Sequence, residues 1–423
     1  MSDLKGNCLV AQSGGPTAVI NASVCGVIQE ALAHREIEGI YGAYNGILGV
    51  LKEELLDLRA EDPEAVEMLK STPSAALGSC RHKLKNLAES RRDYERVLEV
   101  FKAHNIRYFF YIGGNDSMDT AAKLKDLSAQ LGYEMAVMGV PKTIDNDLAF
   151  TDHCPGYGSV AKYIAVSAME AGRDTESLYT FDTCAVLETM GRNAGWITAA
   201  AALARRYEED APHLVYVPEV SFSREKFIED VRAVHAKYGR CFIAASEGMR
   251  WDNGRYVTED HSALAKDSFG HAQLGGVAQV LKHIIEKELG LKTRWMMQGL
   301  TQRNAMHFAS RTDRDEAWLC GAEAVRQAVS GVSGFMVTLE RAPHGPYRVQ
   351  TGLAKLEDVA NGEKKLPREW MNEQGNFPTA EFLDYARPLI EGEVELPMAG
   401  GLPMFMRFRK EWLVPKCQPY KVG

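Results

Sequence analysis

Two short stretches contain the side chains best able to do chemistry: residues 111–120 (YIGGNDSMDT) and residues 139–148 (GVPKTIDNDL). Each follows or includes an apolar run typical of a β-strand, and each ends in small, polar and acidic residues. Ligands of open α/β sheets bind outside the carboxyl ends of the strands, so we expect both stretches to border one crevice. The polar side chains delivered to that crevice are Asn115, Asp116, Asp145 and Asp147.

The first stretch also has features of an anion site. Gly113 and Gly114 remove side chains where the backbone must approach a ligand. Ser117 is predicted to cap a following helix, whose free amides then point toward an anion such as phosphate. The alternative is an ordinary turn, because Gly, Asn and Asp are the commonest turn formers. Because two such stretches occur together, a ligand-binding site is favoured over two ordinary turns.

Carboxylates beside a phosphate require a cation that neutralises both. Asp116, Asp145 and Asp147 therefore indicate Mg²⁺, which prefers oxygen ligands, and one of the three is free to act as a general base.

The bulk composition limits the classes of partner. At 423 residues the chain is long enough for two α/β domains, and a hydrophobic fraction of 45% is that of an ordinary globular protein. A formal net charge of −8 argues against nucleic acid or an anionic membrane as the main partner. An anionic substrate would therefore need a local basic pocket.

The cysteines and the N-terminus predict a cytoplasmic protein. Eight cysteines are scattered without a C-x-x-C pair, which excludes the usual zinc and redox motifs and gives no sign of a disulfide framework. The N-terminal residues lack the apolar core of a signal peptide. The longest apolar run, residues 196–204, is too short to span a membrane.

Other stretches repeat the pattern of a strand followed by a glycine-bearing turn. Gly14 and Gly15 follow the first apolar run, but the Lys of a Walker loop is absent. We expect strands at 8–11, 38–43, 107–112, 134–140, 184–187, 213–217 and 241–245, and helices at 18–33, 91–104, 117–131, 160–171 and 279–289. Residues 342–367, rich in Gly, Pro and charge, predict an excursion or lid.

The order of seven motifs resembles the phosphofructokinase family. The motifs are S-G-G, G-S-x-R, G-G-x-D-S, P-K-T-I-D-N-D, M-G-R, E-G and T-R-x₇-Q-R, and the match as a whole runs from about residue 9 to residue 325. The resemblance implies an α/β fold of two Rossmann-like α/β/α domains with the active site in the cleft between them. It implies a larger phosphoryl-donor domain at 1–150 plus about 304–345, a smaller sugar-phosphate domain at 151–303, and an extension at 346–423 of unclear role.

The same resemblance assigns roles to individual residues. Asp145 resembles the base that takes the proton from the 1-hydroxyl of fructose 6-phosphate, and Asp147 helps to organise the site. The implied catalytic residues are Asp145, Lys142, Asp116, Asp147 and Thr143. The implied substrate contacts are Thr143, Asp145, Met190, Gly191, Arg192, Glu247, Arg294, Leu300 and Arg303. The implied diphosphate contacts are Gly14, Gly15, Arg81, Gly114 and Ser117, and the implied Mg²⁺ contacts are Asn115 and Asp116.

Two positions indicate the phosphoryl donor. Members of the family that use ATP have glycine where this chain has Asp116 and Lys142, whereas members that use pyrophosphate have Asp and Lys there. A carboxylate at Asp116 would occupy the place of the α-phosphate of a nucleotide. The resemblance therefore implies a reversible pyrophosphate:fructose 6-phosphate 1-phosphotransferase.

Some positions depart from the family pattern. Asn115 stands where many members have an Asp linked to Mg²⁺, and Leu300 stands where a His or Tyr touches the sugar phosphate. Residues 181–183 contain no Arg where allosteric bacterial members have one, and Cys25 occupies the place of an effector-binding Arg. The resemblance therefore implies a nonallosteric enzyme that forms a homo-oligomer, predicted to be a dimer.

Other functions remain open from the sequence. An ATP-dependent phosphofructokinase is the first alternative. A noncatalytic regulatory subunit of the same fold would be expected to lose the base or the sugar arginines, whereas Asp145, Arg192 and Arg303 are all present. A lipid or NAD kinase would not need the M-G-R or T-R-x₇-Q-R motif.

Overall fold

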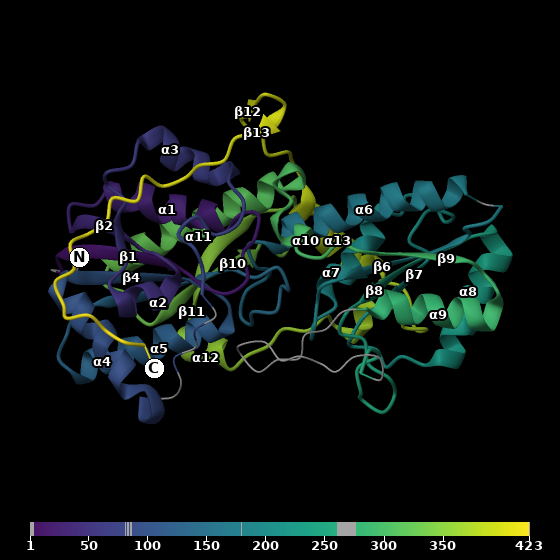
Figure 1. The fold of residues 1–423 in the computed structure, drawn as a ribbon, viewed down its shortest axis with the longest axis horizontal. Helices are drawn as coiled ribbons and strands as arrows, with labels where there is room; N and C mark the ends of the chain where they lie inside the picture. Colours follow the sequence, from purple (N-terminus) through teal and green to yellow (C-terminus); the bar gives the residue numbers. More distant parts are fainter. Residues whose placement is uncertain are drawn as a thin grey trace.

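The chain forms two α/β bodies side by side, each built on its own β-sheet (Figure 1). The computed structural model describes residues 4–422 except 81, 83, 85–86, 179 and 260–275. The predicted fold class, two Rossmann-like α/β/α bodies, is confirmed. The exact division into domains stays a prediction.

The larger body contains a seven-stranded sheet in the order β11-β10-β5-β4-β1-β2-β3. Its inner strands are parallel, and only the edge strands β3 and β11 run antiparallel to their neighbours. The strands are β1 (Gly6–Gln12), β2 (Ile37–Ala43), β3 (Leu55–Asp57), β4 (Ile106–Gly113), β5 (Ala136–Pro141), β10 (Phe335–Arg341) and β11 (Val349–Lys355).

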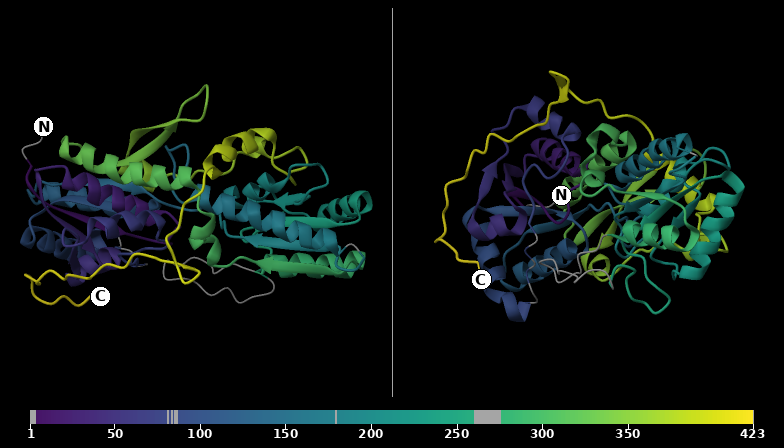
Figure 2. Two further views of the ribbon diagram at one scale, coloured as in Figure 1. Left: turned by 90° about the horizontal axis from the view of Figure 1, so that it is seen from above. Right: turned by 45° about the vertical axis from the view of Figure 1, so that its right-hand side comes forward.

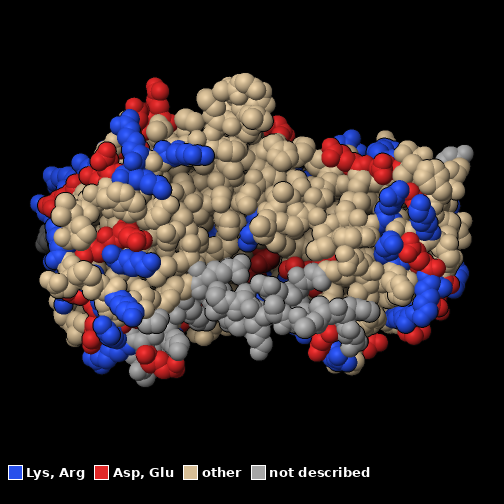
Figure 3. All heavy atoms as spheres, viewed as in Figure 1, with Lys and Arg blue, Asp and Glu red and all other residues tan. Residues whose placement is uncertain are grey.

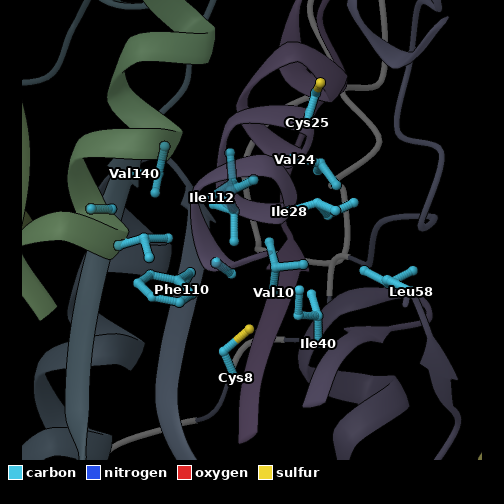
Figure 4. Close-up of a cluster of buried hydrophobic side chains, with 14 of the residues drawn as sticks. Cys8, Val10, Val24, Cys25, Ile28, Ile40, Leu58, Phe110, Ile112 and Val140 are labelled. Atoms are coloured by element: carbon cyan, nitrogen blue, oxygen red, sulfur yellow. The ribbon is translucent and has the colours of Figure 1, made fainter. Parts of the chain in front are cut away.

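Alternate side chains of these strands pack into two separate hydrophobic cores, one on each face of the sheet. Cys8 and Val10 point to one face, against α1 (Ile20–Leu32) and α11 (Arg311–Val329), as Figure 4 shows for part of this cluster. Leu9 points to the opposite face. This face is covered by α2 (Gly46–Lys52), α4 (Leu87–Ala103), α5 (Asn115–Gln130) and α12 (Leu356–Ala360), while α3 (Pro63–Met68) lies on the first face. A strand buried on both faces reads as a continuous apolar run, which is the pattern seen in β1 and β4.

The smaller body contains a four-stranded parallel sheet in the order β7-β8-β6-β9. Its strands are β6 (Cys184–Thr189), β7 (Leu214–Tyr216), β8 (Cys241–Ser246) and β9 (Thr293–Met297). Helices α6 (Tyr157–Ser177) and α7 (Trp196–Ala200) cover one face, and α8 (Arg224–Tyr238) and α9 (Val277–Leu289) cover the other. The short helix α10 (Thr301–Asn304) follows β9, and 3₁₀ helices lie at Leu69–Ser71, Ala201–Ala204, Met306–Phe308, Arg368–Trp370 and Arg387–Ile390.

The last 80 or so residues touch both bodies. Helix α13 (Ala380–Ala386) packs into the core of the smaller body. After the hairpin of β12 (Met398–Ala399) and β13 (Leu402–Pro403), the yellow chain in Figure 2 returns along the larger body, where Met406 and Phe408 join its core. The expectation of a lid at 342–367 is wrong for β11 and α12, because this part completes the large sheet and one of its covering helices.

Every strand and helix expected from the sequence is present, with ends that differ by a few residues. The largest difference is α6, which extends from Tyr157 to Ser177 where residues 160–171 were predicted. The described residues contain no helix that is both long enough and apolar enough to cross a membrane.

Two glycines allow α1 and α11 to approach each other closely. A Cβ at Gly26 would lie 2.2 Å from the carbonyl oxygen of Trp318, and a Cβ at Gly321 would lie 2.1 Å from the carbonyl oxygen of Ser23. Both obstacles are backbone atoms, which cannot rotate away. Because α1 directly follows the loop that contains Gly14 and Gly15, this contact also fixes that loop.

We predict that Gly26→Ala lowers the stability of the larger body. Overpacking against backbone costs about 1–3 kcal/mol, which exceeds the gain of about 1 kcal/mol from the better helix propensity of alanine. Thermal unfolding followed by circular dichroism measures the effect, with Gln130→Ala at the exposed end of α5 as the control. An unchanged midpoint in Gly26→Ala would contradict the close contact.

Candidate active site

A cleft of about 480 Å³ lies between the two bodies. Parallel strands place their carboxyl ends at one edge of each sheet, and the cleft is lined by the loops that follow β1, β4, β5, β6 and β8. Acidic and basic atoms are visible as a recessed group at the junction of the bodies in Figure 3. Residues that follow the strands of both sheets therefore form the site.

The loop after β4 supplies the start of a long helix. Helix α5 begins with Gly114 as its N-cap, and no side chain caps its first amides. The predicted capping role of Ser117 is therefore wrong, because Ser117 lies inside the first turn. Its hydroxyl occupies the space beside Gly113, where a Cβ would approach it to 2.0 Å. The uncapped end of α5 leaves amide donors at the cleft, which favours an anion.

Lys142 connects the loop after β5 to the loop after β1. Its Nζ donates a hydrogen bond of 2.8 Å to the carbonyl oxygen of Gly15. A Cβ at Gly14, which has a φ of 76°, would lie 3.2 Å from the same Nζ. Burial lowers the pKa of Lys142 to about 8, although the nearby charges of Asp145 and Asp147 oppose this shift. The amine can therefore lose its charge within a mildly alkaline range.

The two acids of the loop after β5 have unusual protonation behaviour. Burial raises the pKa of Asp145 to about 7, and repulsion from Asp147 and Glu247 adds to the rise. Burial also raises the pKa of Asp147, while a hydrogen bond from Thr143 opposes it. The backbone N–H of Asp145 donates to Oγ1 of Thr143 at 3.0 Å, which shapes the turn. A carboxylate with a pKa near 7 is suited to proton transfer at neutral pH.

The smaller body presents a turn after β6 that packs on the turn after β8. Ser246 donates from its hydroxyl to the carbonyl oxygen of Gly191 at 2.6 Å. A Cβ at Gly248 would lie 2.0 Å from the carbonyl oxygen of Arg192, so only glycine allows the two turns to meet. Burial raises the pKa of Glu247 to about 7, with the charge of Glu188 adding to the rise and that of Arg192 opposing it.

Arg303 extends across the cleft from α10. A Cβ at Gly15 would lie 3.1 Å from Nη1 of Arg303, so this guanidinium borders the loop after β1 of the larger body. The neighbouring Gln302 accepts a hydrogen bond of 3.0 Å from the backbone N–H of Met190 through its Oε1. Helix α10 is thereby joined to the turn after β6.

Comparisons with known proteins identify the family. The family model described as "Phosphofructokinase" matches residues 7–328. The chain belongs to the phosphofructokinase family.

Similar proteins cover almost the whole chain. A pyrophosphate–fructose 6-phosphate 1-phosphotransferase of Methylococcus capsulatus is 48% identical over 402 residues, which is 95% of each chain. An enzyme of the same name from Halomonas elongata is 46% identical over 98% of this chain and 99% of its own. The crystal structure of a pyrophosphate-dependent phosphofructokinase from Marinobacter aquaeolei superposes with a TM-score of 0.90, at 43% identity, over 99% of this chain and 100% of that one.

Most residues that the family resemblance predicted for the site line this one cleft, while their individual roles stay predictions. They are Gly14, Gly15, Gly114, Asn115, Asp116, Ser117, Lys142, Thr143, Asp145, Asp147, Met190, Arg192, Glu247 and Arg303. Gly191 does not itself line the cleft. It lies in the turn between Met190 and Arg192, where it adopts a φ of 127°. Arg81 lies outside the described residues.

Two predicted substrate contacts do not line the cleft. Arg294 lies near the beginning of β9, at the opposite end of the strand from the cleft, and its Nη2 lies 2.6 Å from Oδ2 of Asp182. Leu300 is 63% exposed and is not one of the residues that line the cleft. A single chain therefore does not bring these two side chains to the other site residues.

Sequence reasoning missed several lining residues, namely Ser13, Pro16, His82, Tyr111, Thr120, Ile144, Asn193, Ala194 and Glu363. Most of them adjoin predicted residues, so a wider reading of each strand end would have found them. Glu363 had no such signal, because it belongs to the C-terminal segment far from every motif.

The residues present fit a magnesium ion held partly by phosphate. Oδ1 of Asn115 is buried without a hydrogen-bond partner among the described residues, and Asp116 follows it in the first turn of α5. Within the described ranges no group of three or more His, Cys, Asp and Glu side chains is arranged to hold a metal. Mg²⁺ commonly uses one or two carboxylates together with substrate phosphates, so a full protein cage is not required.

We predict a bell-shaped dependence of kcat/KM on pH. As the general base that the family resemblance implies, Asp145 must be ionised to accept a proton, so activity should rise as the pH passes about 7. In the catalytic role that the resemblance implies for it, Lys142 must be charged to bind phosphate, so activity should fall as the pH passes about 8. Lys142→Arg keeps its charge at higher pH, and the alkaline limb should move upward in this variant. An alkaline limb that stays in place would contradict the role of Lys142.

Proposed function

We propose that this chain transfers a phosphoryl group reversibly from pyrophosphate to the 1-hydroxyl of fructose 6-phosphate, giving fructose 1,6-bisphosphate and phosphate. The observation that carries the proposal is the pairing of Asp116 and Lys142 in one cleft with Gly14 and Gly15. The names of the near-full-length relatives support the same reaction.

In this proposal Asp145 acts as the general base. It removes the proton from the 1-hydroxyl while that oxygen attacks the terminal phosphorus of pyrophosphate, and the bond to the bridging oxygen breaks to release phosphate. The pKa of Asp145 near 7 lets it accept the proton at neutral pH and return it in the reverse direction. A positioned base is worth about 10²–10⁴ in rate.

Cations of the cleft stabilise the charge on the transferring group. Lys142 lies beside the loop with Gly14 and Gly15, where it neutralises the leaving phosphate. Arg303 borders the same loop from the opposite side of the cleft. The charge of Arg192 acts on Asp145 and Glu247, where it opposes the burial-driven rise of both pKa values. Such fixed charges act in phosphoryl transfer mainly by positioning and electrostatic stabilisation.

Asp116 excludes a nucleotide donor. Two like charges about 4 Å apart at an effective dielectric constant near 20 repel by roughly 4 kcal/mol. This energy corresponds to about three orders of magnitude in affinity. The α-phosphate of ATP would meet this repulsion, whereas pyrophosphate has no third phosphate to place there.

The charge balance of the cleft supports Mg²⁺ as the cofactor. Among the described lining residues, five carboxylates outnumber three Lys and Arg cations, yet both substrates are anions. The acidic residues are Asp116, Asp145, Asp147, Glu247 and Glu363, and the basic residues are Lys142, Arg192 and Arg303. Asn115 and Asp116 would hold the ion, which would offset the charge of the bound diphosphate.

We further propose a nonallosteric homodimer in the cytoplasm. Strand β9 is an edge of its sheet, and two of its apolar side chains, Trp295 and Met297, are exposed, as is Leu300 shortly after the strand. Such an apolar strip favours association with a second copy. All eight cysteines are free thiols, as is usual for a reducing compartment.

We predict that the double variant Asp116→Gly, Lys142→Gly shifts the donor preference toward ATP. Removing the carboxylate relieves the repulsion of the α-phosphate, and removing the amine weakens pyrophosphate binding. A coupled assay with fructose 6-phosphate, Mg²⁺ and either donor measures kcat/KM for each. The expected change in the ratio is about 10³ or more in favour of ATP.

The controls are the wild-type chain and Asp119→Gly, which removes a carboxylate one turn further along α5 that does not line the cleft. Wild-type use of ATP in preference to pyrophosphate would contradict the proposed function. An unchanged donor ratio in the double variant would contradict the roles of Asp116 and Lys142.

A further inference from the structure

The turn between the two acids is held by the C-terminal segment. Asn146, between Asp145 and Asp147, has a φ of 55° and is fully buried. Asparagine tolerates this left-handed conformation better than most residues. Its side chain points into the protein and the neighbouring acids border the cleft, so the contacts of Asn146 help to set the direction of both carboxylates.

Three groups hold the side chain of Asn146. Its Nδ2 donates to the hydroxyl oxygen of Tyr385 at 2.9 Å, and its Oδ1 accepts from the backbone N–H of Cys154 at 2.9 Å. The Nζ of Lys364 donates to the same Oδ1 at 3.4 Å. Two of the three partners belong to residues 346–390, which the family model does not cover.

The same segment also holds the backbone of the turn. The N–H of Lys364 donates to the carbonyl oxygen of Asp147 at 2.8 Å. Its Nζ donates to the carbonyl oxygens of Asp152 at 2.7 Å and Thr151 at 3.1 Å. A Cβ at Gly362 would lie 2.6 Å from the Cβ of Ala149, so the absence of a side chain at Gly362 permits this close approach.

The ring of Tyr385 packs into the core of the smaller body. Its hydroxyl donates to the carbonyl oxygen of Asp152 at 2.8 Å, and its ring lies 5.4 Å from that of Trp196 and 5.1 Å from that of Trp370, measured between centroids. The helix that carries it, α13, lies at the junction of the two bodies in Figure 2. Tyr385 thus joins the acid turn, which is residues 145–147 of the larger body, to the core of the smaller body.

We propose that Tyr385 and residues 362–364 are positioning elements of the phosphoryl-transfer site, which hold the Asp145–Asp147 turn in its reactive geometry through Asn146. This inference rests on the proposed function. Tyr385 acts through Asn146 and does not touch the substrates. Its loss should therefore lower the rate of the chemical step and leave substrate binding nearly unchanged.

The test is Tyr385→Phe with Tyr133→Phe as the matched control. Both tyrosines are buried to a similar extent, at 9% and 8% exposed. The hydroxyl of Tyr133 also donates to a backbone carbonyl, that of Ile106 at 2.8 Å, but Tyr133 precedes β5 at the end of the strand away from the cleft. Each variant thus loses a buried hydroxyl, and only one loss affects the acid turn.

We expect kcat to fall about tenfold or more in Tyr385→Phe, because small displacements of catalytic groups reduce rates strongly. The KM values for the sugar phosphate and for the donor should stay within about twofold. In Tyr133→Phe all three constants should match the wild type. Gly362→Ala, which pushes the segment away without removing a polar group, should repeat the fall in kcat.

Amide hydrogen exchange of residues 143–148 provides a readout that is independent of activity. Exchange should be faster in Tyr385→Phe than in the wild type and unchanged in Tyr133→Phe, because only the first variant removes the hydrogen bond between Asn146 and the hydroxyl of residue 385. The proposal is overturned if kcat of Tyr385→Phe matches that of Tyr133→Phe. It is also overturned if kcat falls while exchange in this segment stays at the wild-type rate.

The two proposals can fail separately. If the wild-type chain does not use pyrophosphate, the proposed function fails, and the positioning role is then tested with the donor that the wild type does use. If the wild type uses pyrophosphate and Tyr385→Phe behaves as the control does, only the positioning role fails.

Discussion

The site depends on one electrostatic constraint: carboxylates and a single amine are held together where little water can screen them. The shared burial of Asp145, Asp147 and Glu247 raises the pKa of each, while burial lowers that of Lys142. Among the described lining residues, Lys142 is the only Lys or Arg from the loops after β1, β4 and β5. Its Nζ lies beside the carbonyl oxygen of Gly15, so in the proposed function it is the main cation of the larger body that meets the anionic donor.

The rest of the fold maintains this arrangement. Close packing of α1 and α11 through Gly26 and Gly321 fixes the loop after β1. The turn that contains Arg192 packs closely against the end of β8. Arg303 extends from α10 to the loop after β1 of the larger body. Residues 346–422 then pass from one body to the other and contribute to the cores of both. The two halves of the cleft are thus connected by packing as well as by the chain that links the sheets.

The sequence predicted the fold class and most of the cleft, because buried parallel strands are continuous apolar runs that end at small and acidic residues. It failed where the signal was not local. Ser117 has the residue type of an N-cap, but packing beside Gly113 places it inside the helix. Glu363 and Tyr385 carry no motif, and only tertiary contacts bring them to the acid turn. Arg294 and Leu300 belong to a family motif, yet a single chain leaves both outside the cleft.

In the proposed function, Asp116 and Lys142 make the cleft selective for an inorganic donor. The most direct measurement is calorimetric titration of the wild-type chain, with Mg²⁺ present, with a non-hydrolysable diphosphate and with a non-hydrolysable ATP analogue. Repulsion between Asp116 and the α-phosphate predicts that the diphosphate binds about three orders of magnitude more tightly. Equal affinities, or tighter binding of the ATP analogue, would contradict the account.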